Sequence, residues 1–108
     1  MPTDDTDKWL IDPEYKARIV ATLWYLGAVD DEIPVYAETS SLAVRVAHEG
    51  ESGRVWFLIG AMAESDFVPV KWATEDMTHV TLVDSSQRIA EYIRLMDESA
   101  LPDALRDI

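Results

Sequence analysis

The spacing of apolar residues constrains the fold of this chain more than any other feature. From residue 13 to 26, Tyr15, Ile19 and Leu23 recur at the three- and four-residue intervals of an amphipathic helix. Asp12 precedes this stretch as a candidate N-cap, a proline occupies the first helical position, and a glycine follows the last turn. The pattern therefore predicts a helix over residues 13–26.

The same periodicity returns near the end of the chain. Ile89 and Ile93 belong to an apolar stripe at helical spacing, and Asp84 with Gln87 has the spacing of a capping box. These residues predict a second helix over residues 85–98, with Asp84 as its N-cap.

Between the two helices the period changes to two. Leu42, Val44 and Val46 alternate with smaller or polar residues, which is typical of a strand. Further β-rich segments are expected, with Pro69 in an edge strand or bulge, and the predicted strands are 42–47, 54–59, 67–72 and 78–83. A fifth short element near residues 35–37 is either a strand or a turn of helix.

Sequential strands with short connections favour an antiparallel sheet. We therefore expect an α+β fold, a two-layer sandwich in the order α-β-β-β-β-α. The sheet would have four or five strands, and the N- and C-terminal helices would cover one of its faces.

Length and charge distribution favour one domain over residues 1–108, with loosely ordered acidic ends at 1–11 and 99–108. The chain has no cysteine, and its N-terminus lacks the basic and apolar regions of a secretory signal. Both features are consistent with a reducing cytoplasm, where we expect the protein.

The formal net charge is −12, from 21 Asp and Glu against 9 Lys and Arg. Binding to phosphate requires clustered Lys and Arg, so this balance disfavours direct contact with nucleic acid or an anionic membrane. It favours a basic protein partner.

Catalytic and metal motifs are not recognisable in the sequence. His48 and His79 lie in different segments without zinc-binding spacing, and no nucleophile elbow or phosphate-binding loop occurs. We expect no enzymatic activity, no cofactor and no metal.

A winged helix is a competing interpretation of the first half of the chain. Helix 13–26, a second helix over 39–49 and a wing from Arg54 onward would produce it. The β alternation after Leu42 argues against that second helix, which would hold a single cation, Arg45. We therefore expect no reading of DNA by this route.

Our leading hypothesis is a small non-enzymatic interaction protein, such as an inhibitor, an immunity protein or a phage-encoded antagonist of a nucleic-acid-handling complex. Carboxylates in predicted turns would steer the basic partner, and exposed aromatic residues would anchor it. The candidate contact residues are Asp30, Asp31, Glu32, Glu49, Glu51, Glu64, Asp66, Glu75, Asp76, Trp24 and Trp56.

Two other functions remain open. The acidity could be a solubility adaptation of an ordinary cytosolic protein from a halophile, since the chain has three Lys and no Asn. Alternatively, an α+β domain could bind a small molecule or catalyse a reaction at a site that the sequence does not reveal. An uncovered sheet face or free edge would also allow a homodimer.

Overall fold

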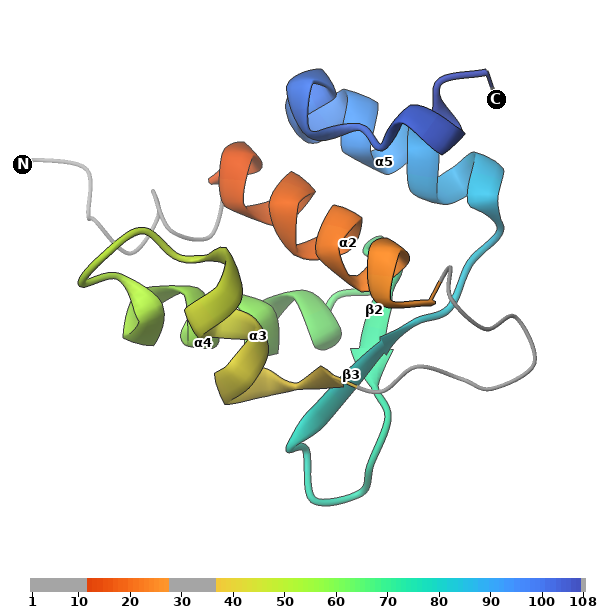
Figure 1. The fold of residues 1–108 in the computed structure, drawn as a ribbon. Coiled ribbons are helices and arrows are strands. Elements are labelled where there is room, and N and C mark those ends of the chain that lie inside the picture. Colours follow the sequence, from red (N-terminus) through yellow and green to blue (C-terminus); the bar gives the residue numbers. More distant parts are fainter. Residues whose placement is uncertain (1–11, 28–36, 108) are drawn as a thin grey trace, which may run out of the picture.

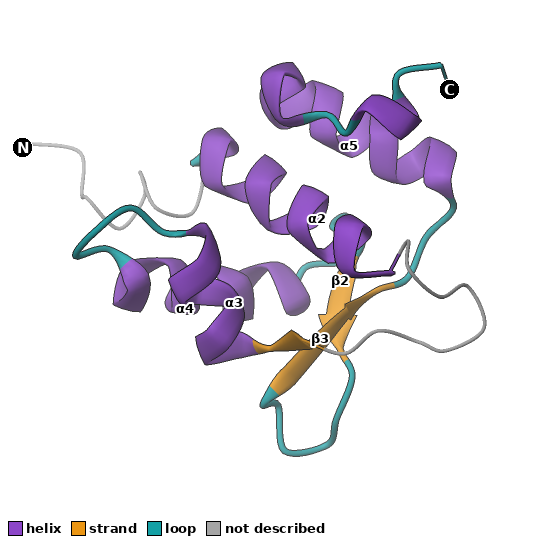
Figure 2. Ribbon diagram, in the orientation of Figure 1, coloured by secondary structure: helices purple, strands orange, loops and turns teal. Residues whose placement is uncertain are grey.

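The computed structural model describes residues 12–27 and 37–107. In Figure 1, α2 lies between α5 on one side and the α3–α4 pair on the other, and Figure 2 shows a small sheet at one end of the helices. The elements are α2 (Pro13–Gly27), β1 (Ala37–Glu38), α3 (Thr39–Val46), α4 (Ser52–Ala63), β2 (Val70–Trp72), β3 (His79–Leu82) and α5 (Ser86–Asp97), followed by 3₁₀ turns at Glu98–Ala100 and Asp103–Leu105.

One hydrophobic cluster joins the helices and the sheet. Ile19 of α2, Ile59 of α4 and Ile93 of α5 are fully buried in it, together with Val70 and Val80 from the strands. Burying such side chains contributes roughly 1.5–3 kcal/mol each. The core therefore lies around α2, which is covered on both sides.

The predicted sheet of four or five strands, and the α-β-β-β-β-α order, are wrong. Within the described residues the sheet has three antiparallel strands in the order β1-β3-β2. Ala37 of β1 stands opposite Val80 of β3, and Val70 of β2 stands opposite Leu82 of β3. The fold is α+β, with a small antiparallel sheet that packs against one end of a mainly helical core.

The segments predicted as strands 42–47 and 54–59 are helical up to Val46 in α3 and throughout in α4. In α3 the buried residues are Thr39, Leu42, Ala43 and Val46, and in α4 they are Val55, Leu58, Ile59, Met62 and Ala63. Both sets follow helical spacing. The prediction failed because apolar residues also occupy the outward positions, which made a helix resemble an alternating or continuous strand.

The two strongest predictions from periodicity are confirmed. Helices α2 and α5 match the predicted ranges 13–26 and 85–98 to within one residue at each end. Asp12 accepts a bond from the Tyr15 backbone N–H at 3.4 Å, as a cap does. The cap of α5 is Ser85 and not Asp84, because the Ser85 side chain accepts from the Arg88 N–H at 3.3 Å.

Helices α3 and α4, joined by residues 47–51, form a helix-turn-helix, and the β2–β3 hairpin follows directly. With α2 and β1 ahead of them, the order of the elements is α-β-α-α-β-β, an order that winged helices also have. The competing interpretation correctly placed a helix after residue 38, since α3 covers Thr39–Val46. Its wing from Arg54 onward is wrong, because Arg54 lies in α4 and the hairpin begins at Val70. Thr39 fixes the hairpin to the start of α3, since its N–H and hydroxyl both donate to the Thr78 carbonyl at 2.9 and 3.0 Å.

The C-terminal segment, expected to be loosely ordered from residue 99, packs back along α5 instead. Leu101 and Leu105 are buried in the core. The Arg94 guanidinium donates to the carbonyl oxygens of Leu105 and Arg106 at 3.4 and 3.1 Å. These contacts order the chain as far as residue 107.

Among the described helices, none combines the length and the apolar character that crossing a bilayer would require.

Candidate functional site

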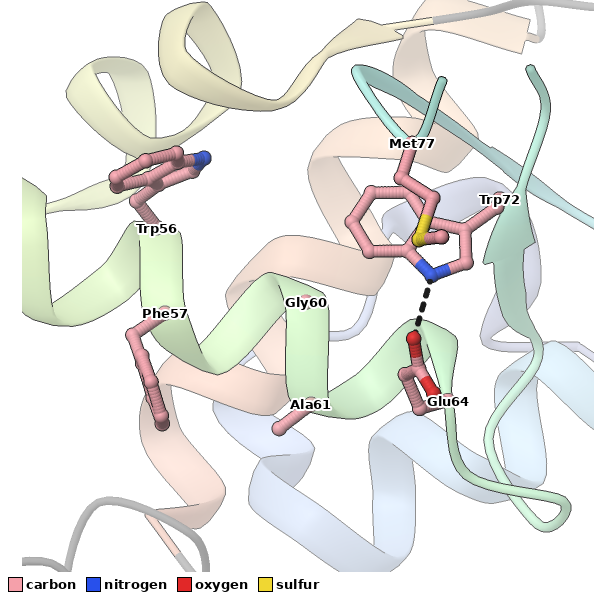
Figure 3. A pocket seen from close by; sticks show the side chains of 7 residues that line it. All are labelled: Trp56, Phe57, Gly60, Ala61, Glu64, Trp72 and Met77. Atoms are coloured by element: carbon pink, nitrogen blue, oxygen red, sulfur yellow. Dashed lines mark hydrogen bonds between the residues drawn. The ribbon is translucent and has the colours of Figure 1, made fainter. Parts of the chain in front are cut away.

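An apolar groove lies between the outward face of α4 and the β2–β3 hairpin. Its volume is about 400 Å³. Figure 3 shows two aromatic residues of α4 at one end and residues of the hairpin at the other. The lining residues are Trp56, Phe57, Gly60, Ala61, Glu64, Trp72 and Met77.

The helix side of the groove follows from the spacing of residues along α4. Trp56 and Phe57 lie one helical turn before Gly60 and Ala61, and Glu64 lies one turn later. Trp56 is 57 % exposed and Phe57 is 61 % exposed, whereas the opposite face of the helix is buried. A helix in this position would ordinarily present polar side chains to water, whereas α4 presents two aromatic ones.

The hairpin side of the groove is held to α4 by one hydrogen bond. The Trp72 indole Nε1–H donates to the Glu64 carboxylate at 3.2 Å (Figure 3). The Trp72 ring also lies over Gly60, where a Cβ would meet it at an ordinary contact distance of 3.7 Å. The indole and the carboxylate therefore form one end of the groove.

Met77 reaches the groove from the loop between the two strands. Its φ angle is +58°, a left-handed conformation that non-glycine residues seldom adopt. Asp76 stabilises this loop, because its carboxylate accepts from the hydroxyls of Thr74 and Thr78 at 2.7 and 2.8 Å. Those hydrogen bonds lower the pKa of Asp76 below its usual value, so the loop stays negatively charged well into the acidic range.

A polar network at the other end of α4 fixes the direction of the helix. The Arg54 guanidinium binds Asp12 and Glu51 at 3.1 Å each. The Tyr15 hydroxyl donates to Glu51 and accepts from the His48 backbone N–H at 3.2 Å. The hydrogen bond from Tyr15 and the nearby Arg54 lower the pKa of Glu51. Burial and the bond to Glu51 raise the pKa of Tyr15.

Charge on the groove face is predominantly negative. Between residues 52 and 82 the acidic residues are Glu64, Asp66, Glu75 and Asp76, against two cations. Arg54 is bound to carboxylates, and the Lys71 ammonium donates to the Ser65 carbonyl. The face thus combines exposed aromatic side chains with surrounding carboxylates.

The structure brings together part of the predicted contact set. Trp56 and Glu64 line the groove, and Glu75 and Asp76 precede Met77 in the hairpin loop. Asp66 is exposed in the connection from α4 to β2, next to Phe67, which is 93 % exposed.

The other predicted residues lie elsewhere. Trp24 is partly buried on α2, where it packs on the core and against the Tyr25 ring. Glu49 is exposed in the α3–α4 turn, and Glu51 is engaged by Tyr15 and Arg54. Asp30, Asp31 and Glu32 lie outside the described residues.

Sequence reasoning missed Phe57, Gly60, Trp72 and Met77 as groove residues. The signal lies in the run from 55 to 63, which is too apolar for an ordinary surface helix and part of which, 54–59, is predicted from the sequence as a strand. When the residues of this run are placed at helical spacing, one stripe of apolar residues faces the core, and Trp56 and Phe57 face outward.

The groove offers little for acid–base chemistry, because Glu64 is the single ionisable residue in its lining. Within residues 12–27 and 37–107, no three His, Asp or Glu side chains gather as a metal site would require. The chemistry available at the groove is apolar contact, ring stacking and one carboxylate.

Comparison with known proteins gives no relative: no family model, curated protein or solved structure matches this chain.

Proposed function

We propose that this chain is a non-enzymatic protein-interaction module whose groove face binds a basic protein partner. The groove face comprises the outward side of α4 and the β2–β3 hairpin. Aromatic and methionine side chains of the groove provide apolar anchoring. The surrounding carboxylates steer the partner and select it by charge.

The exposed pair Trp56 and Phe57 on α4 is the observation that carries this proposal. Two large aromatic side chains on one helix turn, each more than half exposed, are costly to leave in water. Aromatic residues at the centre of a patch surrounded by polar groups are typical of binding hot spots. Their neighbours in the groove, Trp72 and Met77, extend the same apolar surface.

The order of the elements resembles that of a winged helix and would by itself favour DNA binding. The negative charge of the groove face argues against DNA binding and favours a basic protein partner. A helix-turn-helix domain inserts its second helix, here α4, into the major groove and contacts phosphates with Lys and Arg. The one cation of α4, Arg54, is bound to Asp12 and Glu51, and the hairpin loop carries Glu75 and Asp76. Phosphates approaching this face would meet carboxylates.

Selection from a random peptide-display library tests the proposal. We expect the ligands to have a positive net charge and at least one apolar anchor, and their affinity to fall from low to molar salt. Trp56→Ala should weaken them about thirtyfold or more, as loss of a hot spot of about 2 kcal/mol does.

Leu95→Ser is the control, because Leu95 is also an exposed apolar residue, 77 % exposed, but lies on α5. It should leave the affinity unchanged. Ligands without a charge bias, or ligands that bind Trp56→Ala as well as the parent, would contradict the proposal.

A small apolar molecule is a second candidate occupant, favoured by the groove volume of about 400 Å³. Small-molecule sites usually measure roughly 300–1,000 Å³. Such a ligand would bind without dependence on salt. Saturable binding of neutral aromatic fragments, together with no binding of cationic peptides, would favour it.

A further inference from the structure

We infer that the groove receives an arginine side chain of the partner, whose guanidinium stacks on the groove aromatics and donates to Glu64. This inference rests on the proposed function, because it names the anchor that a basic partner would insert. The guanidinium would bind at the end of the groove that Trp72, Glu64 and Gly60 form.

The Trp72–Glu64 hydrogen bond prepares the carboxylate for this role. One oxygen of Glu64 accepts from the indole N–H at 3.2 Å, which fixes the side chain beside the ring. Within the described residues, no protein group bonds to the second oxygen of Glu64. A carboxylate that is held in place with a free oxygen at the end of an aromatic groove is a preorganised acceptor for a cationic donor.

The shape of the groove accommodates a long side chain with a flat end. Gly60 has no side chain, and the groove that it lines extends between Trp56 on α4 and Trp72 on the hairpin (Figure 3). The methylene groups of an arginine would lie against this apolar floor, as long cationic side chains do on apolar surfaces. Its guanidinium would then reach the indole and Glu64 together.

Arginine fits these groups better than lysine does. A guanidinium is planar and weakly hydrated, so it stacks on an aromatic face while donating in its own plane. An ammonium is strongly hydrated and loses more solvation in an apolar groove. A neutral apolar side chain would fill the floor but would donate nothing to the second oxygen of Glu64.

The test uses the indole N–H resonance of Trp72 in the full chain as a reporter. The probes are five-residue alanine peptides, capped at both ends, with Arg, citrulline, Lys or Leu at the centre. Citrulline has nearly the shape of arginine and no charge. We expect a saturable shift of the Trp72 resonance with the Arg peptide. The Lys peptide should bind several-fold more weakly than the Arg peptide. The citrulline and Leu peptides should bind at least tenfold more weakly than the Arg peptide.

Glu64→Gln keeps an oxygen acceptor for the indole but removes the charge, so it should weaken the Arg peptide several-fold without loss of structure. Glu91→Gln, an exposed carboxylate of α5, is the control and should have no effect. Equal binding of the Arg and citrulline peptides overturns the inference. So does the absence of any Trp72 shift at about 20 mM peptide, well above a millimolar dissociation constant.

The outcomes separate this inference from the proposed function. If cationic ligands from display bind the groove face and tolerate citrulline at every arginine, the arginine anchor is wrong and the protein-binding role stands. If no cationic ligand binds the groove face, both are wrong.

Discussion

Met77 shows how a single strained residue can be maintained by its neighbours. Its positive φ places a side chain in a backbone region that costs roughly 1–2 kcal/mol for an L-residue other than glycine. The bonds from Thr74 and Thr78 to Asp76 hold the loop in that shape. Strain of this kind gathers at functional positions, and here it delivers the methionine to the groove.

Comparison of the variants Met77→Gly and Met77→Ala distinguishes the effect of backbone strain on stability from the effect of the methionine side chain on binding. Glycine relieves the strain but adds freedom to the unfolded chain, so we expect stability to be unchanged or to rise by up to about 1 kcal/mol. Alanine keeps the strain and should be the less stable of the two. Both should weaken cationic ligands by a similar factor. Thermal unfolding and ligand titration give the two readouts, and a glycine variant with full affinity would contradict the account.

Tyr15 and Glu51 give a prediction for acidic pH. Because the pKa of Glu51 is lowered in the fold, its stabilisation is complete above the ordinary value of 4.5 and is lost as the pH falls below it. Tyr15→Phe removes the hydrogen bond that contributes most to this lowering. The variant should have an unfolding midpoint on the order of 5 °C lower at neutral pH.

The difference between Tyr15→Phe and the parent should shrink as the pH falls below 4.5, because protonated Glu51 no longer benefits from the bond. Thermal unfolding across that pH range measures it. A difference in unfolding midpoint that grows at low pH would contradict the role given to the Tyr15–Glu51 hydrogen bond.

At the scale of elements, the sequence is informative where one face of a helix is polar. The stripes containing Ile19 in α2 and Ile89 in α5 stand out against charged neighbours, and both helices were predicted. Helix α4 was not predicted, because the outward Trp56 and Phe57 remove the polar face that identifies an amphipathic helix. The outward aromatic residues that prevented prediction of the helix are thus the same residues on which its proposed role in binding rests.

The contact residues, like the helices, could be predicted only where a local sequence pattern identifies them. Acidic residues in turns are visible in a sequence, and Glu64, Asp66, Glu75 and Asp76 lie on the face of α4 and the hairpin. Their association with Trp72 depends on the hairpin folding back on α4, a contact between distant segments that no local pattern encodes.

Glycine substitutions test the described geometry of α4. Gly60→Ala should stabilise the fold by about 0.5–1 kcal/mol, since alanine favours helix and the new Cβ meets Trp72 at an ordinary 3.7 Å. Gly50→Ala, in the turn before α4, should destabilise by a similar amount because φ is +84° there. Chemical denaturation measures both. A destabilising Gly60→Ala would mean that Trp72 packs closer to α4 than described.

At the scale of the whole molecule, the negative net charge can either promote binding of a basic partner or keep the protein soluble in a saline cytoplasm. Several carboxylates are already paired in the fold, including Glu14 with Arg18 and Asp103 with Arg106. The core is closed around α2 by apolar contacts that do not depend on salt. These features favour a fold that is stable at low salt.

Thermal unfolding from no added KCl to molar KCl checks this expectation. We expect a folded protein at low salt whose midpoint rises by only a few degrees. Folding that begins only in molar KCl would mean that carboxylate repulsion dominates, which would favour the halophile alternative.

The central claim is that the face formed by α4 and the hairpin binds a basic protein segment. Amide chemical-shift mapping with the strongest cationic peptide from display tests it most directly, with a duplex DNA titration at low salt beside it. The account predicts shifts concentrated at residues 56–64 and 72–77 and no binding of DNA. Shifts confined to α5 or α2, or DNA binding that maps to α4, would contradict it.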